Sequence, residues 1–247
     1  MYEFRRILAA DLQNLFTNPM WLVTSTVYPA ALILVLGFLA SGSYGQAVTS
    51  YDYYGVAMLL YLVFNVATFS ANSFMEERIK SPNMRIVYSP IPAWFIHLSK
   101  VLATTVFCSV SYGLVAVVLH LALGINYGGA GSWAFAVLVF LSILFFSAFG
   151  VLVCCLLKSE GSANQLVSLL VTVFAVLGGL FFPVDGLGGA VAVASWASPA
   201  KWILVASLRI IYDGDLALLA PAAAILGALT LACVLASSRI FRGEEYL

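Results

Sequence analysis

Charged residues are scarce in this chain of 247 residues, and the middle of each long apolar stretch contains none of them. Asp, Glu, Lys and Arg make up 9% of the sequence, whereas soluble domains contain about 25%. Hydrophobic residues make up 63%, which is more than a soluble core of this size can hide from water. The zero net charge gives no indication of a nucleic-acid partner. The lack of ionisable groups in mid-stretch argues against a proton- or sodium-coupled carrier, which needs them as a relay.

Catalytic motifs are equally scarce. The two histidines, His97 and His120, are too far apart for zinc-site spacing such as His-Glu-x-x-His. Neither a Gly-x-Ser-x-Gly elbow nor a Gly-x-x-x-x-Gly-Lys phosphate loop occurs. We therefore expect no catalytic residue, no metal site and no cofactor in this chain; if it drives active transport, a separate subunit must bind ATP and Mg²⁺. The cysteines all fall within apolar stretches, as expected of small packing residues: Cys108, Cys154, Cys155 and Cys233.

Six long apolar stretches dominate the chain. A bilayer's hydrocarbon core is about 30 Å thick and a helix rises about 1.5 Å per residue, so roughly 20 apolar residues span it. The stretches lack the alternation of apolar and polar residues that a transmembrane barrel shows. We predict an all-α membrane protein, a single integral membrane domain over residues 1–247, with six transmembrane helices. They lie at approximately Trp21–Ala40, Tyr53–Phe74, Leu98–Leu123, Ala134–Leu157, Leu166–Phe182 and Leu216–Ala236.

The positive charges indicate the orientation, because Lys and Arg gather on the cytoplasmic side of membrane proteins. With six spans, one side carries Arg5, Arg6, Arg78, Lys80, Arg85, Lys100, Lys158, Arg239 and Arg242. The other side carries only Lys201 and Arg209. We therefore expect a multi-pass protein of the plasma membrane with both termini in the cytoplasm. A signal peptide is the competing interpretation of the first stretch, but its apolar run is long and Glu3 and Asp11 precede it.

Residues 1–19 are amphipathic. Apolar side chains share one helical stripe (Phe4, Ile7, Leu8, Leu12, Leu15 and Phe16), and Arg5, Arg6, Asp11, Gln13 and Asn14 lie elsewhere. This pattern is typical of a helix that lies in the membrane interface, which Asn18-Pro19 would end. Such a helix is either a membrane anchor or a docking element for a partner.

Two further segments between the stretches are distinctive. Residues 75–97 are the most polar part of the chain, and Ser89-Pro90-Ile91-Pro92 forces a turn before the third stretch. This loop either transmits force to a cytoplasmic partner or is simply solvated. Residues 183–212 begin with an apolar run, Val184–Trp196, that is too short to span. We predict a pair of short re-entrant helices there, between the fifth and sixth transmembrane helices on the outer side.

Polar side chains form ordered stripes on two of the spans. On the second span they recur at helical spacing as Tyr61, Asn65, Thr68, Asn72 and Glu76; on the fifth they are Gln165, Ser168 and Thr172. Amides in lipid cost free energy unless they are paired or face a hydrated cavity. The stripes are either a translocation surface or sites of interhelical hydrogen bonding, worth about 0.6 kcal/mol per contact.

The order of these features resembles the membrane subunit of type-2 ATP-binding-cassette (ABC-2) exporters. The resemblance is carried by the amphipathic helix, Glu76-Glu77-Arg78 with the Pro-containing loop, Gly178-Gly179…Phe182-Pro183, and Ser198-Pro199…Trp202. It implies a coupling helix that seats on a nucleotide-binding ATPase subunit through Glu76, Glu77, Arg78, Lys80 and Arg85. The sequence Ile79-Lys80-Ser81-Pro82 departs from the family's usual Gly-Thr step there.

The resemblance also implies a dimer with a second copy of this permease or a related one. The second and fifth spans would line the path, and Phe181, Phe182 and Pro183 would form an extracellular gate. The function expected is export of an amphiphilic drug, antibiotic or peptide out of the cell, powered by separate ATPase subunits. Two alternatives stay open: export of a lipid or lipid-linked glycan by the same kind of protein, and a non-transporting membrane enzyme or scaffold.

Overall fold

The computed structural model describes residues 2–43, 45, 48–75, 92, 94–184 and 188–241, and these residues form helices and no strands. The α-helices are α1 (Tyr2–Thr17), α2 (Pro19–Leu22), α3 (Tyr28–Leu39), α4 (Ser50–Met75), α6 (Trp94–Leu123), α7 (Ser132–Leu157), α8 (Glu160–Gly178), α9 (Gly189–Ser195), α10 (Pro199–Leu208) and α11 (Leu219–Ile240). A π-helical turn, Val23–Val27, joins α2 to α3, and another, Arg209–Asp213, follows α10. Short 3₁₀ turns lie at Ser41–Ser43 and Gly129–Gly131.

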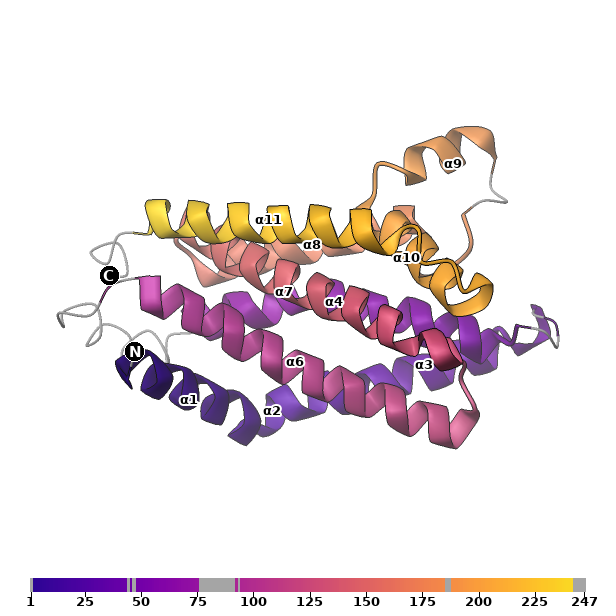
Figure 1. The fold of residues 1–247 in the computed structure, drawn as a ribbon, viewed down its shortest axis with the longest axis horizontal. Helices are drawn as coiled ribbons and strands as arrows, with labels where there is room; N and C mark the ends of the chain where they lie inside the picture. Colours follow the sequence, from indigo (N-terminus) through magenta and orange to yellow (C-terminus); the bar gives the residue numbers. More distant parts are fainter. Residues whose placement is uncertain are drawn as a thin grey trace.

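Six helical segments are long and apolar enough to cross a membrane, which confirms the predicted fold class. They are Pro19–Leu39, Ser50–Met75, Trp94–Leu123, Gly129–Leu157, Glu160–Gly178 and Leu219–Ile240. The spans run side by side as a bundle (Figure 1). Both ends of the described chain lie at one end of this bundle, here called the termini end; the α3–α4 and α6–α7 connections lie at the opposite, far end.

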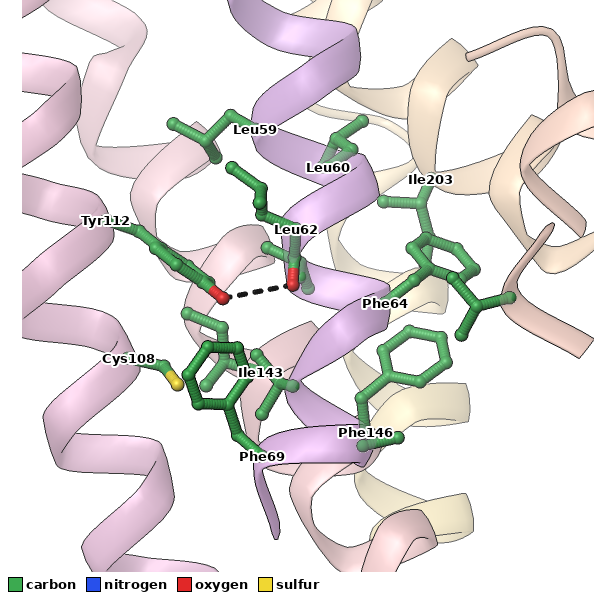
Figure 2. Packing of buried hydrophobic residues seen from close by; sticks show 14 of the residues in the cluster. Leu59, Leu60, Leu62, Phe64, Phe69, Cys108, Tyr112, Ile143, Phe146 and Ile203 are labelled. Atoms are coloured by element: carbon green, nitrogen blue, oxygen red, sulfur yellow. Dashed lines mark hydrogen bonds between the residues drawn. The ribbon is translucent and has the colours of Figure 1, made fainter. Parts of the chain in front are cut away.

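Helix α4 is the centre of the bundle. In its most apolar window 83% of the residues are buried, against 11% in α11. It packs against α3, α6, α7 and α8, and Figure 2 shows its buried side chains among those of neighbouring helices. Close contact with α7 is possible because Gly150 has no side chain where the backbone of Ala67 passes. A helix so enclosed has few positions at which anything outside the monomer can reach it.

Serines tie three of these helices together through buried hydrogen bonds. The Ser70 hydroxyl of α4 donates to the Ser147 carbonyl of α7 at 2.7 Å, and the Ser147 hydroxyl lies 3.0 Å from the Val101 carbonyl of α6. A hydroxyl that would be costly in hydrocarbon is thereby paired. These serines are structural.

The fifth span lies earlier in the chain than its apolar residues indicate. Helix α8 begins after Ser159, whose hydroxyl caps the first turn, and it ends at Gly179, which has φ +82°. This left-handed conformation favours glycine and ends a helix. Phe181 and Phe182, which we predicted within the span, therefore follow it in a bent, non-helical segment.

A sharply bent pair of helices precedes the sixth span. Segments Gly189–Ser195 and Pro199–Asp213 meet at 93°, because Ser198 caps the second of them and Pro199 occupies its first turn. Helix α9 projects from the far end of the bundle, while α10 packs against α8 and α4 (Figure 1). The bend agrees with the predicted re-entrant segment.

Helix α1 forms over Tyr2–Thr17 as predicted and packs along α6. Our assignment of Asp11 to its polar side was wrong. The Asp11 side chain is buried and pairs with Lys100, which is 1% exposed, and the Ser99 hydroxyl donates to the same carboxylate. The partner charge on α6 makes burial of this carboxylate possible.

Candidate functional site: a polar surface along α4 and α8

The only half-exposed positions of α4 between Tyr54 and Met75 are the four polar-stripe residues Tyr61, Asn65, Thr68 and Asn72. Every other residue in that segment is buried. Apolar residues therefore hold α4 in the bundle on all sides but one, and that side carries a phenol, two amides and a hydroxyl. The stripe predicted from spacing thus coincides with the accessible line of the central helix.

Helix α8 lies along this line. At the termini end, an Asn164 amide hydrogen bonds to the Asn72 side chain. Toward the far end, the Tyr61 and Phe181 rings are 5.1 Å apart between centroids. Helix α8 contacts the bundle through a face of mostly small residues at helical spacing: Ala163, Val167, Val171, Ala175 and Gly178. Its predicted polar residues Gln165, Ser168 and Thr172 are all exposed.

Asn164 was missing from the predicted stripe of α8. It lies four residues before Ser168 and eight before Thr172, so helical periodicity alone could have included it. In the structure it is the residue of α8 that bonds to the α4 stripe, and its Oδ1 is buried without a partner.

The hydrogen bonds of the stripe residues differ from one residue to the next. Asn72 makes an interhelical bond, whereas the Asn65 amide donates to the Tyr61 carbonyl of its own helix at 2.8 Å. Thr68 Oγ1 is buried and has no hydrogen-bond partner among the described residues. On α8 the Thr172 hydroxyl donates to the Ser168 carbonyl at 2.8 Å. Pairing between helices therefore accounts for Asn72 alone, whereas Asn65 bonds within α4 and the Thr68 hydroxyl is buried without a partner among the described residues.

At the far end, two tyrosines of α4 hold the segment that follows α8. The Tyr53 hydroxyl donates to the Gly179 carbonyl at 2.6 Å, and the Tyr54 hydroxyl donates to the Phe181 carbonyl at 3.1 Å. Of the predicted gate residues, Phe181 is half-buried against Tyr61, while Phe182 and Pro183 are exposed. The segment thus closes the far end of the α4–α8 surface.

The predicted coupling residues Glu76, Glu77, Arg78, Lys80 and Arg85 lie outside the described residues. What the structure does describe is the helix at either end of that loop. Helix α4 ends at Met75, and α6 begins at Trp94 and reaches the Asp11–Lys100 pair within two turns. Both helix ends lie at the termini end of the bundle, together with α1 (Figure 1).

Comparison with known protein families identifies the arrangement. A family model described as ABC-2 type transporter matches residues 2–212, which is most of the chain and includes α1, α4, α8 and the bent pair. A comparison with individual curated proteins gives no significant match. The family match confirms the resemblance seen in the sequence. The chain therefore belongs to the ABC-2 type transporter family and is the membrane-spanning permease part of an ABC transporter.

Proposed function

We propose that this permease exports an amphiphilic drug, antibiotic or peptide, and that the cargo passes along the polar surface of α4 and α8. The observation that carries the proposal is the coincidence of the polar stripe with the half-exposed line of α4. Exposed polar groups in a membrane must meet water, cargo or another protein chain, since lipid tails offer no hydrogen bonds. An amphiphile satisfies these amides and also tolerates the neighbouring apolar residues.

The proposed assembly pairs two such permeases, identical or related, so that their α4–α8 surfaces enclose one path. Helix α8 supports this arrangement because Ser168 and Thr172 are exposed in the monomer. Two nucleotide-binding ATPase subunits would bind ATP and Mg²⁺ and contact the loop that contains Glu76, Glu77 and Arg78. This assignment places the termini end, with both termini, in the cytoplasm of a cell whose plasma membrane holds the complex.

Reconstitution of the permease with its ATPase subunit in proteoliposomes tests this function. Substrate-stimulated ATP hydrolysis and cargo uptake into inverted vesicles should both fall when Asn65→Leu and Thr68→Val remove the polar groups of the path. Val110→Leu on α6, where Val110 is 54% exposed on the outside of the bundle, provides the matched apolar control. Unchanged transport in the stripe variant would overturn the proposed path.

A second pair of variants tests the coupling. Glu77→Ala/Arg78→Ala should abolish stimulation of ATP hydrolysis while cargo still binds, because the loop would no longer transmit the movement of the ATPase. Loss of cargo binding with unchanged basal ATP hydrolysis would place these residues in the path instead, against the proposal.

A further inference from the structure

A cavity lies on the outside of the bundle, away from the α4–α8 surface. It occupies the seam between α6 and α7, has a volume of about 470 Å³, and reaches inward to Leu59 of α4. Pockets of about 300–1,000 Å³ are typical of small-molecule sites. Its inner wall contains Tyr112 and Ile143, which Figure 2 shows beside α4; the Tyr112 hydroxyl donates to the Leu62 carbonyl at 3.1 Å.

The seam opens toward the membrane. Val117, Trp133 and Phe140 line it and are 56%, 56% and 45% exposed. It extends from Ser132 at the start of α7 to Ile143, eleven residues and thus roughly 16 Å along the helix. One end therefore lies at the far end of two spans, where Trp133 suits the head-group level, and the other end lies near mid-span.

Polar groups stand at both ends of this otherwise apolar seam. Ser109 Oγ, midway along α6, and the Tyr127 hydroxyl are buried, and neither has a hydrogen-bond partner in the part of the chain that the structure describes. Burial, with a smaller effect of the nearby Asp52, raises the pKa of the Tyr127 phenol, so it stays protonated. His120 Nδ1 lies 2.7 Å from the Ile125 carbonyl, which can only accept. Nδ1 therefore carries a proton, and in that tautomer of the imidazole Nε2 is the acceptor at the far end.

The charges indicate what kind of amphiphile fits. The residues that line the seam include no Asp, Glu, Lys or Arg. The Asp52 carboxylate close to Tyr127 already accepts hydrogen bonds from the backbone N–H groups of Thr49 and Asn126. An anionic head group would meet this carboxylate without a cation to offset it, and a cation would find no free carboxylate among the lining residues. A neutral head group with a hydroxyl matches the acceptor and the hydroxyls that are present.

We propose that the α6–α7 seam binds a neutral, hydroxyl-bearing membrane lipid from the leaflet at the far end. The lipid hydroxyl bonds to His120 Nε2 and Tyr127, and its acyl chain lies along Tyr112 and Ile143 toward mid-span. The site is separate from the path between α4 and α8, and its occupancy does not depend on transport.

Photolabelling in nanodiscs tests the site without nucleotide. The full-length chain is placed in phosphatidylcholine nanodiscs that contain a monoacylglycerol with a diazirine on its acyl chain, and adducts are mapped by mass spectrometry. We expect adducts enriched on α6 and α7 at the seam over those on α11. A matching diazirine probe built on anionic phosphatidic acid should show no enrichment.

Two glycines offer matched variants. A Cβ on Gly113, which lines the seam, or on Gly227, on the exposed side of α11, meets no atom within 4 Å. Gly113→Leu should therefore fill the seam without disturbing the helix and reduce its labelling to the level found on α11, while Gly227→Leu should leave it unchanged. His120→Ala keeps the cavity and should lower labelling about fivefold, the effect of losing one neutral hydrogen bond.

Three outcomes would overturn the proposal. Equal labelling of wild type and Gly113→Leu would mean that the probe reports bulk lipid only. Equal enrichment of the anionic probe would exclude the neutral selectivity. A seam without adducts, beside normally labelled α11, would mean that another protein chain covers it.

Discussion

Asp11 and Lys100 are opposite charges that depend on each other for burial. Removing either ion from water costs several kcal/mol, and only the partner, with the Ser99 hydroxyl on the same carboxylate, offsets that cost. The pair joins the N-terminal helix α1 to α6 at the termini end of the bundle. This polar contact thereby adds to the apolar packing that holds α1 against α6.

Lys100→Met should lower the free energy of unfolding by about 3–5 kcal/mol, because Asp11 stays buried without its cation. Titration with sodium dodecyl sulfate in mixed micelles, followed by tryptophan fluorescence, measures this change. The double variant Asp11→Leu/Lys100→Met should recover most of the loss, since no charge is then buried. A double variant as unstable as Lys100→Met would show that the lost packing of the lysine stem, and not the unpaired charge, causes the effect.

The sequence could not predict this pair. Helical periodicity does place Asp11 on the apolar side, because it lies four residues after Ile7 and four before Leu15, but nothing local indicates a lysine 89 residues later as its partner. The same limit applies to Asn164. Its place in the helical repeat can be read from the sequence, but its contact with Asn72 depends on how α8 packs. Periodicity predicts which side of a helix a residue occupies, whereas its partner follows from the tertiary arrangement.

Helices α4 and α7 pack closely, and their contact depends on one glycine. A Cβ at Gly150 would collide with the Ala67 carbonyl, so the two backbones could not keep their separation. This approach lets α4 sit at the centre of the bundle and leaves only its polar line accessible. Packing of α4 and access to the candidate path are therefore linked.

Gly150→Ala should destabilise the protein by about 1–3 kcal/mol, the usual cost of overpacking. Gly227→Ala is the control, because a Cβ there meets nothing within 4 Å and alanine favours the helix by up to about 1 kcal/mol. Unfolding in mixed micelles compares the two variants. Equal stabilities would contradict the close α4–α7 contact.

The tyrosines at the start of α4 provide a test of the predicted gate. Tyr54→Phe removes the hydrogen bond to the Phe181 carbonyl and keeps the ring. Hydrogen exchange of the backbone amides in residues 180–184 should become faster. One hydrogen bond contributes about 0.5–1.5 kcal/mol to stability, and the increase in exchange rate should correspond to the loss of that free energy. Tyr51→Phe, on the same helix, serves as the control, and exchange unchanged in Tyr54→Phe would show that the hydroxyl does not hold this segment.

The apolar stretches predicted the number and order of the spans, and the short run after Pro183 predicted the bent pair. The ends of the fifth span were less well predicted. Hydropathy extended it to Phe182, but Ser159 caps α8 earlier and Gly179 ends it. Capping and left-handed glycine act at single residues, so they determine helix ends that an apolar average over about 20 residues cannot resolve.

At the scale of the whole molecule, the bundle has two chemically different ends. The termini end carries α1, the ion pair and the two helices that lead into residues 76–91, whereas the far end carries short connections and the bent helices. The placement of an ATPase at the termini end requires that end to face the cytoplasm. The distribution of Lys and Arg predicts this orientation, because the far end holds only Lys201 and Arg209.

Two variants, each with one added cysteine, measure the orientation in intact cells. Gln13 on α1 and Ala130 at the far end are both exposed. The four native cysteines are buried, so the chain without an added cysteine is the negative control. A membrane-impermeant maleimide should label Ala130→Cys in intact cells and Gln13→Cys only after the membrane is opened. The reverse pattern would place the loop of Glu76–Arg85 outside the cell, where no ATP-hydrolysing subunit could drive it, and the proposed coupling would then fail even though the fold and the family are unchanged.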